Sequence, residues 1–243
     1  MLRSLPLPHY DVVRAGRALS ALLRDPDDLP QVFALIASLS GTAPHRLLRA
    51  FRRSKTGARI LRDRPEIVPL LADRAFLRAL PEGSLGRAYL AFVESEAISA
   101  EGIRNADVDG DSERRLPEVY VYLHHRMRDT HDLWHTATGY KGDVVGELAL
   151  LAFLLGQHWN AGVALIVGAA LLRGWGHDEQ HVVRDAFRRG RAAAWLPAEE
   201  WESMLPLPLP EVRARLGLGE PPQYTPLRTA ELRAIGLVGN RAA

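Results

Sequence analysis

The sequence predicts an all-α protein that folds as a single helical domain over residues 1–243. Three observations favour this class. Apolar residues recur at steps of three and four over most of the chain, which is the period of an amphipathic helix. Prolines, glycines and capping residues separate these segments. No segment alternates apolar and polar residues as a half-buried strand does, and no internal repeat is present.

The first half of the chain holds five predicted helices, bounded by residues that favour helix ends. Pro26 stops the first pattern and Gly41 the second, while Thr42 followed by Pro44 suits the start of the third. The polar segment 97–117 predicts a loop or a short helical turn. The five helices are expected over residues 8–25, 29–41, 42–54, 64–80 and 83–96.

The second half begins with a long helical pattern that ends at Gly139, a favoured residue for a helix C-terminus. Asp143 is the expected N-cap of the next helix, which is apolar almost all round and is therefore predicted to be buried. The C-terminal extension, residues 221–243, is expected to be loosely held. Helices are expected over residues 118–139, 143–160, 161–175 and 177–196, and a proline-rich link followed by a short helix over residues 206–218.

Composition indicates a soluble globular protein without disulfides. Hydrophobic residues make up 47% of the chain, charged residues 25%, and cysteine is absent. Histidine and carboxylate would therefore hold any metal. The net charge of +2 argues against nucleic acid as a partner. No signal peptide is visible, and the longest apolar run is short of the roughly 20 residues that span a membrane. We therefore expect a cytoplasmic location, peripheral to the inner membrane.

Residues 131–147 bring together four candidate metal ligands. His131, Asp132 and His135 lie within five positions, and Glu147 follows twelve residues later. In a helix, His135 would lie about 40° and Asp132 about 100° from His131, so the three share one arc. Glu147 would open the apolar helix, where an unpaired ionised carboxylate is costly. The set suits Zn²⁺, with Fe²⁺ or Mn²⁺ as alternatives.

Structural roles also fit these residues. The histidines could lie at a helix end that favours them, and Glu147 could pair with Arg126 or Arg128. The spacing alone does not decide between these roles and a metal site.

Other features predict chemistry less strongly. His177 and His181 have a chelating spacing, but a solvated helix start explains them better. His124 and His125 suit a surface or core position better than the site. The basic segment 46–64 fits a solvated arginine face first, anionic lipid headgroups second and nucleic acid third.

The segments "RMRDTHDLWHTATGY" and "GDVVGELALLAF" resemble the coenzyme Q biosynthesis protein 4 family, with this chain as a bacterial member. The family signature is His-Asp-x-x-His, eleven residues, then Glu. It matches His131, Asp132, His135 and Glu147 without a change in spacing. The resemblance covers roughly residues 10–220.

This resemblance implies an all-α protein in which the four signature residues are catalytic and bind a divalent metal, usually zinc. It implies a carbon-carbon lyase of ubiquinone biosynthesis, of the 4-hydroxy-3-methoxy-5-polyprenylbenzoate decarboxylase type, with C1 hydroxylation in oxidative versions. Implied partners are the polyprenylated benzoate substrate, a membrane surface and other enzymes of the pathway. A homo-oligomer is left open.

Two other functions are carried as hypotheses. The first is a non-catalytic scaffold that binds prenyl lipids and organises other quinone-biosynthesis enzymes. The second is a non-haem iron oxygenase, because two histidines and a carboxylate can bind Fe(II) with open positions.

Overall fold

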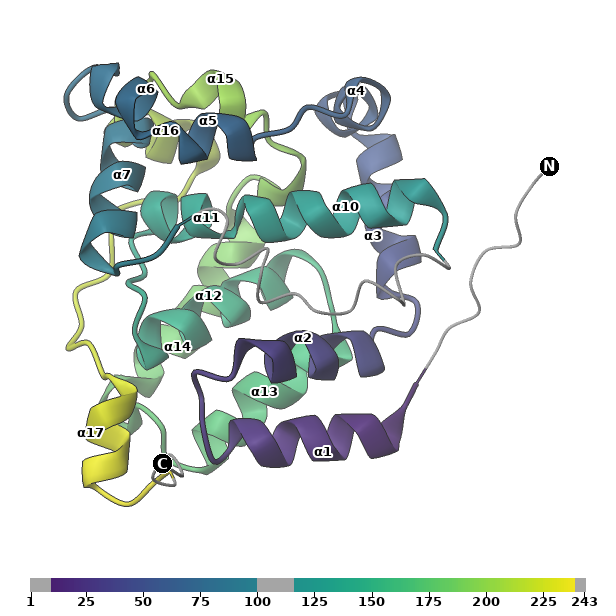
Figure 1. Cartoon of the computed structure of the whole chain (residues 1–243), viewed down its shortest axis with the longest axis vertical. Helices are drawn as coiled ribbons and strands as arrows, with labels where there is room; N and C mark the ends of the chain where they lie inside the picture. Colours follow the sequence, from purple (N-terminus) through teal and green to yellow (C-terminus); the bar gives the residue numbers. More distant parts are fainter. Residues whose placement is uncertain (1–9, 100–115, 239–243) are drawn as a thin grey trace. The chain divides into compact units, whose positions relative to one another are not determined.

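The computed structural model describes residues 10–99 and 116–238, which form two compact units (Figure 1). Of the described residues, the first unit contains 45–99, 116–139 and 192–221, and the second contains 10–44, 140–191 and 222–238. In the described residues every regular element is a helix, and one isolated bridge joins Ser84 to Pro208. The all-α prediction is therefore confirmed. A single domain over residues 1–243 stays a prediction.

The first unit packs around an aromatic and aliphatic core. Leu48 and Phe51 lie on one face of α3, and they pack with Tyr120 and Leu123 of α10 and with Ile60 of α4. The helices of this unit are α3 (Ala43–Arg53), α4 (Lys55–Asp63), α5 (Val68–Ala72), α6 (Arg74–Ala79), α7 (Leu85–Ser95), α10 (Glu118–Asp129), α11 (His131–Thr138), η2 (Leu196–Ala198), α15 (Trp201–Met204) and α16 (Leu209–Leu216).

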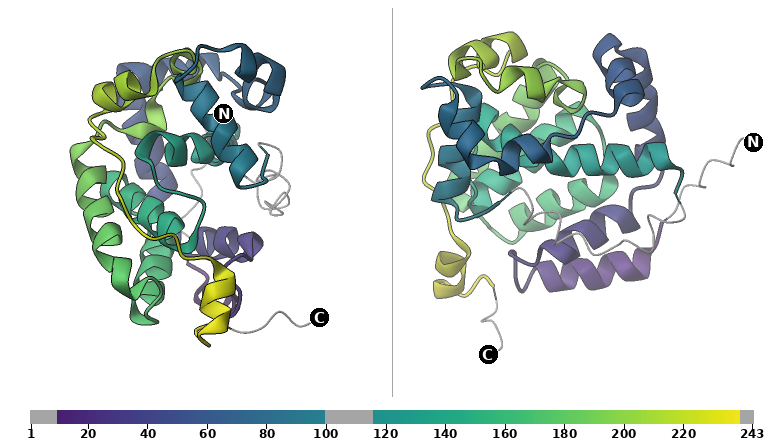
Figure 2. Two further views of the ribbon diagram at one scale, coloured as in Figure 1. Left: turned by 90° about the vertical axis from the view of Figure 1, so that its left-hand side faces the viewer. Right: turned by 45° about the horizontal axis from the view of Figure 1, so that its top comes forward.

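The second unit contains α1 and α2 side by side (Figure 2). Small residues Ala15 and Ala18 of α1 pack with Leu35 of α2. Gly162 lets α13 approach α2, because a Cβ there would lie 2.7 Å from the Cα of Ile36. The helices of this unit are α1 (Val12–Leu22), α2 (Leu29–Ser38), α12 (Val144–Gln157), α13 (Ala161–Leu172), η1 (His177–Glu179), α14 (Gln180–Ala192) and α17 (Thr229–Ala234).

Two predicted helices are each divided in the structure. The pattern 118–139 forms α10 and α11, which meet at Thr130. The Thr130 hydroxyl donates to the Arg126 carbonyl at 2.8 Å, a bond that competes with regular helix geometry. The pattern 64–80 forms α5 and α6, because Asp73 caps α6 by accepting from the Phe76 N–H at 2.9 Å.

The C-terminal extension differs from its prediction. Instead of being loosely held, it forms α17 and hydrogen bonds to the loop between α1 and α2. Thr229 Oγ1 donates to Asp27 Oδ1 at 2.6 Å, and Arg233 Nη2 donates to Asp25 Oδ1 at 2.8 Å. These contacts join positions about 200 residues apart, which local patterns cannot reveal. Most of the predicted loop 97–117 lies outside the described residues.

In the part of the chain that the structure describes, none of the helices combines the length and the apolar character that a bilayer span requires.

Two glycines bring the backbones of α12 and α14 close together. A Cβ on Gly190 of α14 would lie 2.0 Å from the Phe153 carbonyl oxygen of α12. A Cβ on Gly156 of α12 would lie 2.5 Å from the Phe187 carbonyl oxygen of α14. The contact is reciprocal, so each helix supplies a glycine where the other presents a carbonyl.

We expect Gly190→Ala to lower the free energy of unfolding by about 1–3 kcal/mol. The new methyl group would overlap the Phe153 carbonyl of α12, and relieving the overlap requires the two helices to move apart. Gly168→Ala in α13 is the matched control, since its Cβ meets nothing within 4 Å. It should raise the free energy of unfolding by about 0.5–1 kcal/mol through helix propensity. Urea unfolding measures both, and equal effects would contradict the close packing.

Candidate metal centre

The two signature histidines lie together on α11. The ring centroids of His131 and His135 are 4.8 Å apart with an interplanar angle of 70°. His135 is only 1% exposed, whereas His131 is half-buried. Positions four apart on a helix are neighbours on its surface, as the sequence predicts. The pair can therefore present two imidazole nitrogens from one face of one helix.

Asp132 completes the part of the signature that α11 carries. Asp132 is 8% exposed, and its Oδ1 lies 3.3 Å from His131 Nδ1. A carboxylate at this distance can fix the orientation and tautomer of an imidazole. This geometry suits an orienting role beside the histidines.

Two neighbouring elements fix α11 in place. Phe92 of α7 stacks on His135, with ring centroids 5.4 Å apart and planes 15° from parallel. Arg213 of α16 donates from Nε to the Ala137 carbonyl at 2.9 Å and from Nη2 to the Thr136 carbonyl at 3.3 Å. These bonds satisfy carbonyls that the last turn of a helix leaves without partners.

The end of α11 requires glycine. Gly139 has φ 84°, which other residues rarely adopt, and it forms the C-cap as predicted. A Cβ there would also lie 2.6 Å from Pro221 Cβ. The chain therefore turns sharply directly after the histidine helix.

Glu147 is half-buried in the first turn of α12. Asp143 is the N-cap, as predicted, and its Oδ1 accepts from the Val145 N–H at 3.0 Å. Among the described residues, His131, His135 and Glu147 are the candidate metal ligands, and all three lie on helices. The histidines belong to the first unit and Glu147 to the second. Their meeting in one site stays a prediction.

The chain that links α11 to α12 contains the buried Tyr140 and contacts the half-buried Tyr224. Tyr140 Oη accepts from Arg189 Nη1 at 2.6 Å, and burial raises the pKa of this phenol. Burial likewise raises the pKa of Tyr224, far above its usual range. Both hydroxyls are therefore neutral at physiological pH and can serve as hydrogen-bond partners.

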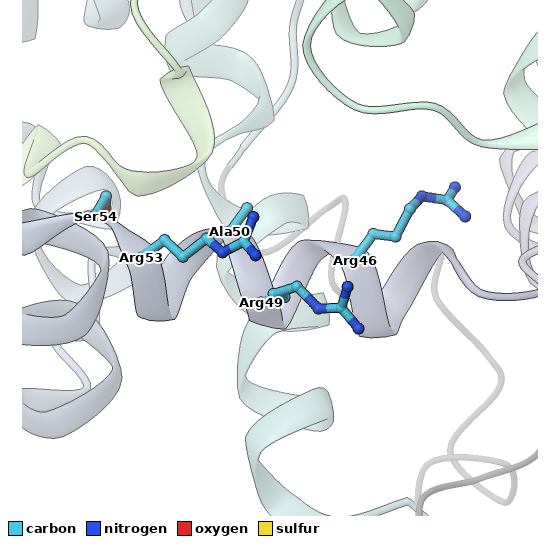
Figure 3. A pocket seen from close by; sticks show the side chains of 5 residues that line it. All are labelled: Arg46, Arg49, Ala50, Arg53 and Ser54. Carbon is cyan, nitrogen blue, oxygen red and sulfur yellow. The ribbon is translucent and has the colours of Figure 1, made fainter.

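The weaker sequence candidates lie elsewhere. His177 and His181 are exposed at the start of α14, as expected for a solvated helix start. His124 and His125 are half-buried on α10, with ring centroids 6.1 Å apart. An open hollow on α3 is lined by Arg46, Arg49, Ala50, Arg53 and Ser54 (Figure 3).

Sequence patterns did not predict the roles of Phe92 and Arg213. Phe92 lies in the predicted helix 83–96, and periodicity placed it on a helix without indicating that it faces His135. Arg213 is one of many arginines, so composition could not distinguish it. Both roles depend on contacts between residues that are distant along the chain.

The family model for "Coenzyme Q (ubiquinone) biosynthesis protein Coq4" matches residues 11–222 of this chain. The chain belongs to the Coq4 family. This range agrees with the resemblance expected over residues 10–220, and it includes all four signature residues. The family model places this Coq4 protein in ubiquinone biosynthesis.

Fungal relatives agree with this assignment, and one solved structure shares the fold. A mitochondrial ubiquinone biosynthesis protein COQ4 from Arthroderma otae is 32% identical over 224 residues, covering 88% of this chain and 79% of the relative. Its counterpart from Talaromyces stipitatus is 32% identical over 225 residues, covering 89% and 75%. A crystal structure from Nostoc punctiforme PCC 73102, provisionally described as a ubiquinone biosynthesis protein, has a TM-score of 0.60. The Nostoc punctiforme chain is 19% identical to this chain, and the match covers 87% of this chain and all of the Nostoc chain.

These relatives correct one expectation. Their names place those proteins in mitochondria, which contradicts the cytoplasmic location that we expected. The expectation was wrong because its grounds, an absence of cysteine and of a visible signal peptide, describe redox chemistry and secretion rather than an organelle. That this chain is a bacterial member stays a prediction.

A buried ion pair holds α10, which leads directly into α11. The Arg126 side chain is 1% exposed, and its guanidinium pairs with the Glu202 carboxylate of α15 through two hydrogen bonds. Arg126 Nη2 also donates to the Glu199 carbonyl at 3.0 Å. These bonds connect α10, the helix that precedes the histidines, to residues 199–202, which are more than 70 positions later in the chain.

We expect Arg126→Ala to lower the free energy of unfolding by about 3 kcal/mol, because it leaves a largely buried carboxylate without its partner. Arg59→Ala is the control. It breaks a similar pair with Glu200, but the Arg59 side chain is 48% exposed. Its expected cost is much smaller, because water screens an exposed ion pair. Chemical denaturation would refute the distinction if the two variants lost equal stability.

Proposed function

We propose that this Coq4 protein catalyses the metal-dependent removal of the C1 carboxyl group from a polyprenylated hydroxybenzoate. The observation that carries the proposal is the paired His131 and His135 rings on α11, with Asp132 beside them. Membership of a ubiquinone biosynthesis family supports the substrate class. The reaction makes the protein a carbon-carbon lyase.

The donor set fits a divalent cation. His131 and His135 would hold it from α11, Glu147 from α12, and Asp132 as a fourth ligand or as the group that orients His131. Only five residues separate α11 from α12 along the chain. Two neutral imidazoles and two carboxylates balance a charge of +2. Zinc fits first, and Fe²⁺ or Mn²⁺ also accept these ligands.

The reaction breaks the bond between ring carbon C1 and its carboxylate. Carbon dioxide leaves, the electron pair stays on C1, and C1 then takes a proton. A bound cation supplies a Lewis acid that stabilises this negative charge. His131 and His135 would hold the cation, and the stacked Phe92 keeps His135 in position.

Apolar helices of the second unit are candidate walls for the prenyl tail. α12 and α13 pack together and consist almost entirely of aliphatic residues. Leu165 and Leu172 of α13 remain exposed, and Leu172 is 91% exposed. A long hydrocarbon chain needs such a surface because its burial from water is favourable.

Contact with a membrane surface is the second part of the proposal. α3 carries Arg46, Arg49, Arg52 and Arg53 on its exposed side and contains no acidic residue. Figure 3 shows three of these arginines extending from α3 around the open hollow. Basic amphipathic helices with this pattern bind anionic headgroups, where a prenylated substrate and the other enzymes of the pathway would also be found.

We expect His135→Ala and Glu147→Ala each to reduce ubiquinone production at least about 100-fold, because each removes a metal ligand. The measurement is a rescue of a bacterial strain blocked at C1 decarboxylation, with ubiquinone and its carboxylated precursor quantified. Bound metal in the purified proteins should fall in parallel. His181→Ala, an exposed histidine of a similar helical pair, should rescue like the wild type.

Equal rescue by Glu147→Ala and the wild type would contradict catalysis at this site and favour the scaffold. Failure of the wild-type chain to rescue would contradict the proposed substrate. The product also tests the oxidative version, because it would carry a hydroxyl group at C1 in place of hydrogen.

We expect Arg49→Glu combined with Arg53→Glu to weaken binding to vesicles that contain phosphatidylserine at least about tenfold, through lost electrostatic attraction. Vesicle sedimentation at low and high salt measures this. Arg59→Glu combined with Arg62→Glu is the matched double charge reversal on α4, where Arg59 pairs with Glu200 and Arg62 with Asp63, and neither residue lines the hollow. A similar loss in both variants would indicate a net-charge effect rather than a face of α3.

A further inference from the structure

A short C-terminal segment, residues 222–228, hydrogen bonds along the chain that enters α12. We call this segment the strap. The Lys141 N–H donates to Tyr224 Oη at 2.8 Å, and the Val144 N–H donates to the Leu227 carbonyl at 2.9 Å. Arg228 Nη1 donates to the Gly142 carbonyl at 3.0 Å. The strap therefore contacts the entry to α12 at several successive positions.

Asp143 joins the strap to the helix start. Its Oδ1 accepts from the Val145 N–H at 3.0 Å and from the Leu227 N–H of the strap at 2.9 Å. Its Oδ2 accepts from the Tyr224 hydroxyl at 2.9 Å. Asp143 is 2% exposed, so these donors replace the water that a carboxylate needs. The same side chain that begins α12 is thus held by two residues of the strap.

Tyr224 also lies against the turn that carries Glu147. A Cβ on Gly146 would lie 2.6 Å from Tyr224 Oη and 2.0 Å from the Lys141 carbonyl oxygen. Gly146 is therefore required for this close approach. The tyrosine hydroxyl occupies the space beside the residue that immediately precedes Glu147.

The strap is itself anchored. Directly after it, α17 is tied to the loop between α1 and α2 through the bonds from Thr229 to Asp27 and from Arg233 to Asp25. The family match ends at residue 222, where the strap begins. The role of the strap is therefore argued from the hydrogen bonds that it forms in this chain.

We propose that Tyr224 is a positioning residue: through Asp143 and Gly146 it fixes the first turn of α12 and hence the direction of the Glu147 carboxylate. This inference rests on the proposed function, in which Glu147 is a metal ligand. A ligand must be held to within about 0.5 Å of its working position, which requires a supporting shell of hydrogen bonds. Tyr224 and Asp143 supply that shell for the second unit.

The test compares the wild-type protein with Tyr224→Phe, using Co²⁺ as a spectroscopic probe in place of the resident metal. The substitution removes one hydroxyl, and with it the bonds to Asp143 and to the Lys141 N–H. We expect Co²⁺ to bind about tenfold more weakly and its visible absorption band to shift, because outer-shell partners tune metal ligands. The control is Tyr122→Phe, a half-buried tyrosine of the first unit whose hydroxyl donates to the Pro65 carbonyl at 3.2 Å.

Thermal unfolding separates positioning from a general loss of stability. If Tyr224→Phe lowers the melting temperature but binds Co²⁺ like the wild type, with an unchanged band, the inference is overturned. An equal loss of Co²⁺ affinity in Tyr122→Phe overturns it as well. If the wild type itself binds no Co²⁺, Zn²⁺ or Fe²⁺, the proposed metal-dependent function is wrong. This outcome differs from the two above, in which the wild type binds the metal and only the role of Tyr224 is rejected.

Discussion

A buried carboxylate must receive hydrogen bonds from protein groups, and Asp143 satisfies this requirement with donors from two distant parts of the chain. The backbone N–H groups of α12 supply some of them, and Tyr224 and Leu227 supply the others. Because the same oxygens serve helix and strap, neither can be displaced without exposing an unsatisfied charge. The start of α12 depends on this one side chain, and under our proposal the direction of the Glu147 carboxylate does too.

The histidine helix depends on a different set of supports. Within the first unit, Phe92 contacts one face of His135, Arg213 satisfies the last carbonyls of α11, and the buried Arg126 pair holds the preceding helix. None of these three residues belongs to the signature. In the proposed metal site the signature supplies the donor atoms, while residues from α7, α10 and α16 supply the rigidity that metal ligands need.

Local patterns predicted the parts of this structure that depend on neighbouring residues. The period of three and four identified most of the longer helices, and the conformational freedom of Gly139 and the capping ability of Asp143 identified the ends of α11 and α12. The close pairing of His131 and His135 also follows from helical spacing alone.

The same patterns could not predict contacts between distant residues. The helix breaks at Thr130, whose hydroxyl bonds back to Arg126, and periodicity does not detect this break. The extension after residue 221 lacks a long apolar pattern, yet Tyr224, Thr229 and Arg233 secure it through polar side chains. Nor can the spacing of residues 131–147 distinguish a ligand from a buried carboxylate with a structural partner.

The reciprocal glycines of α12 and α14 also constrain how this sequence can change over generations. Gly156 and Gly190 serve a single close approach of two backbones, so the effects of replacing them are coupled rather than additive. Once one position has acquired a side chain and the helices have moved apart, the second glycine no longer has a contact to preserve. The two positions are therefore expected to drift together, with a lineage retaining both glycines or losing both.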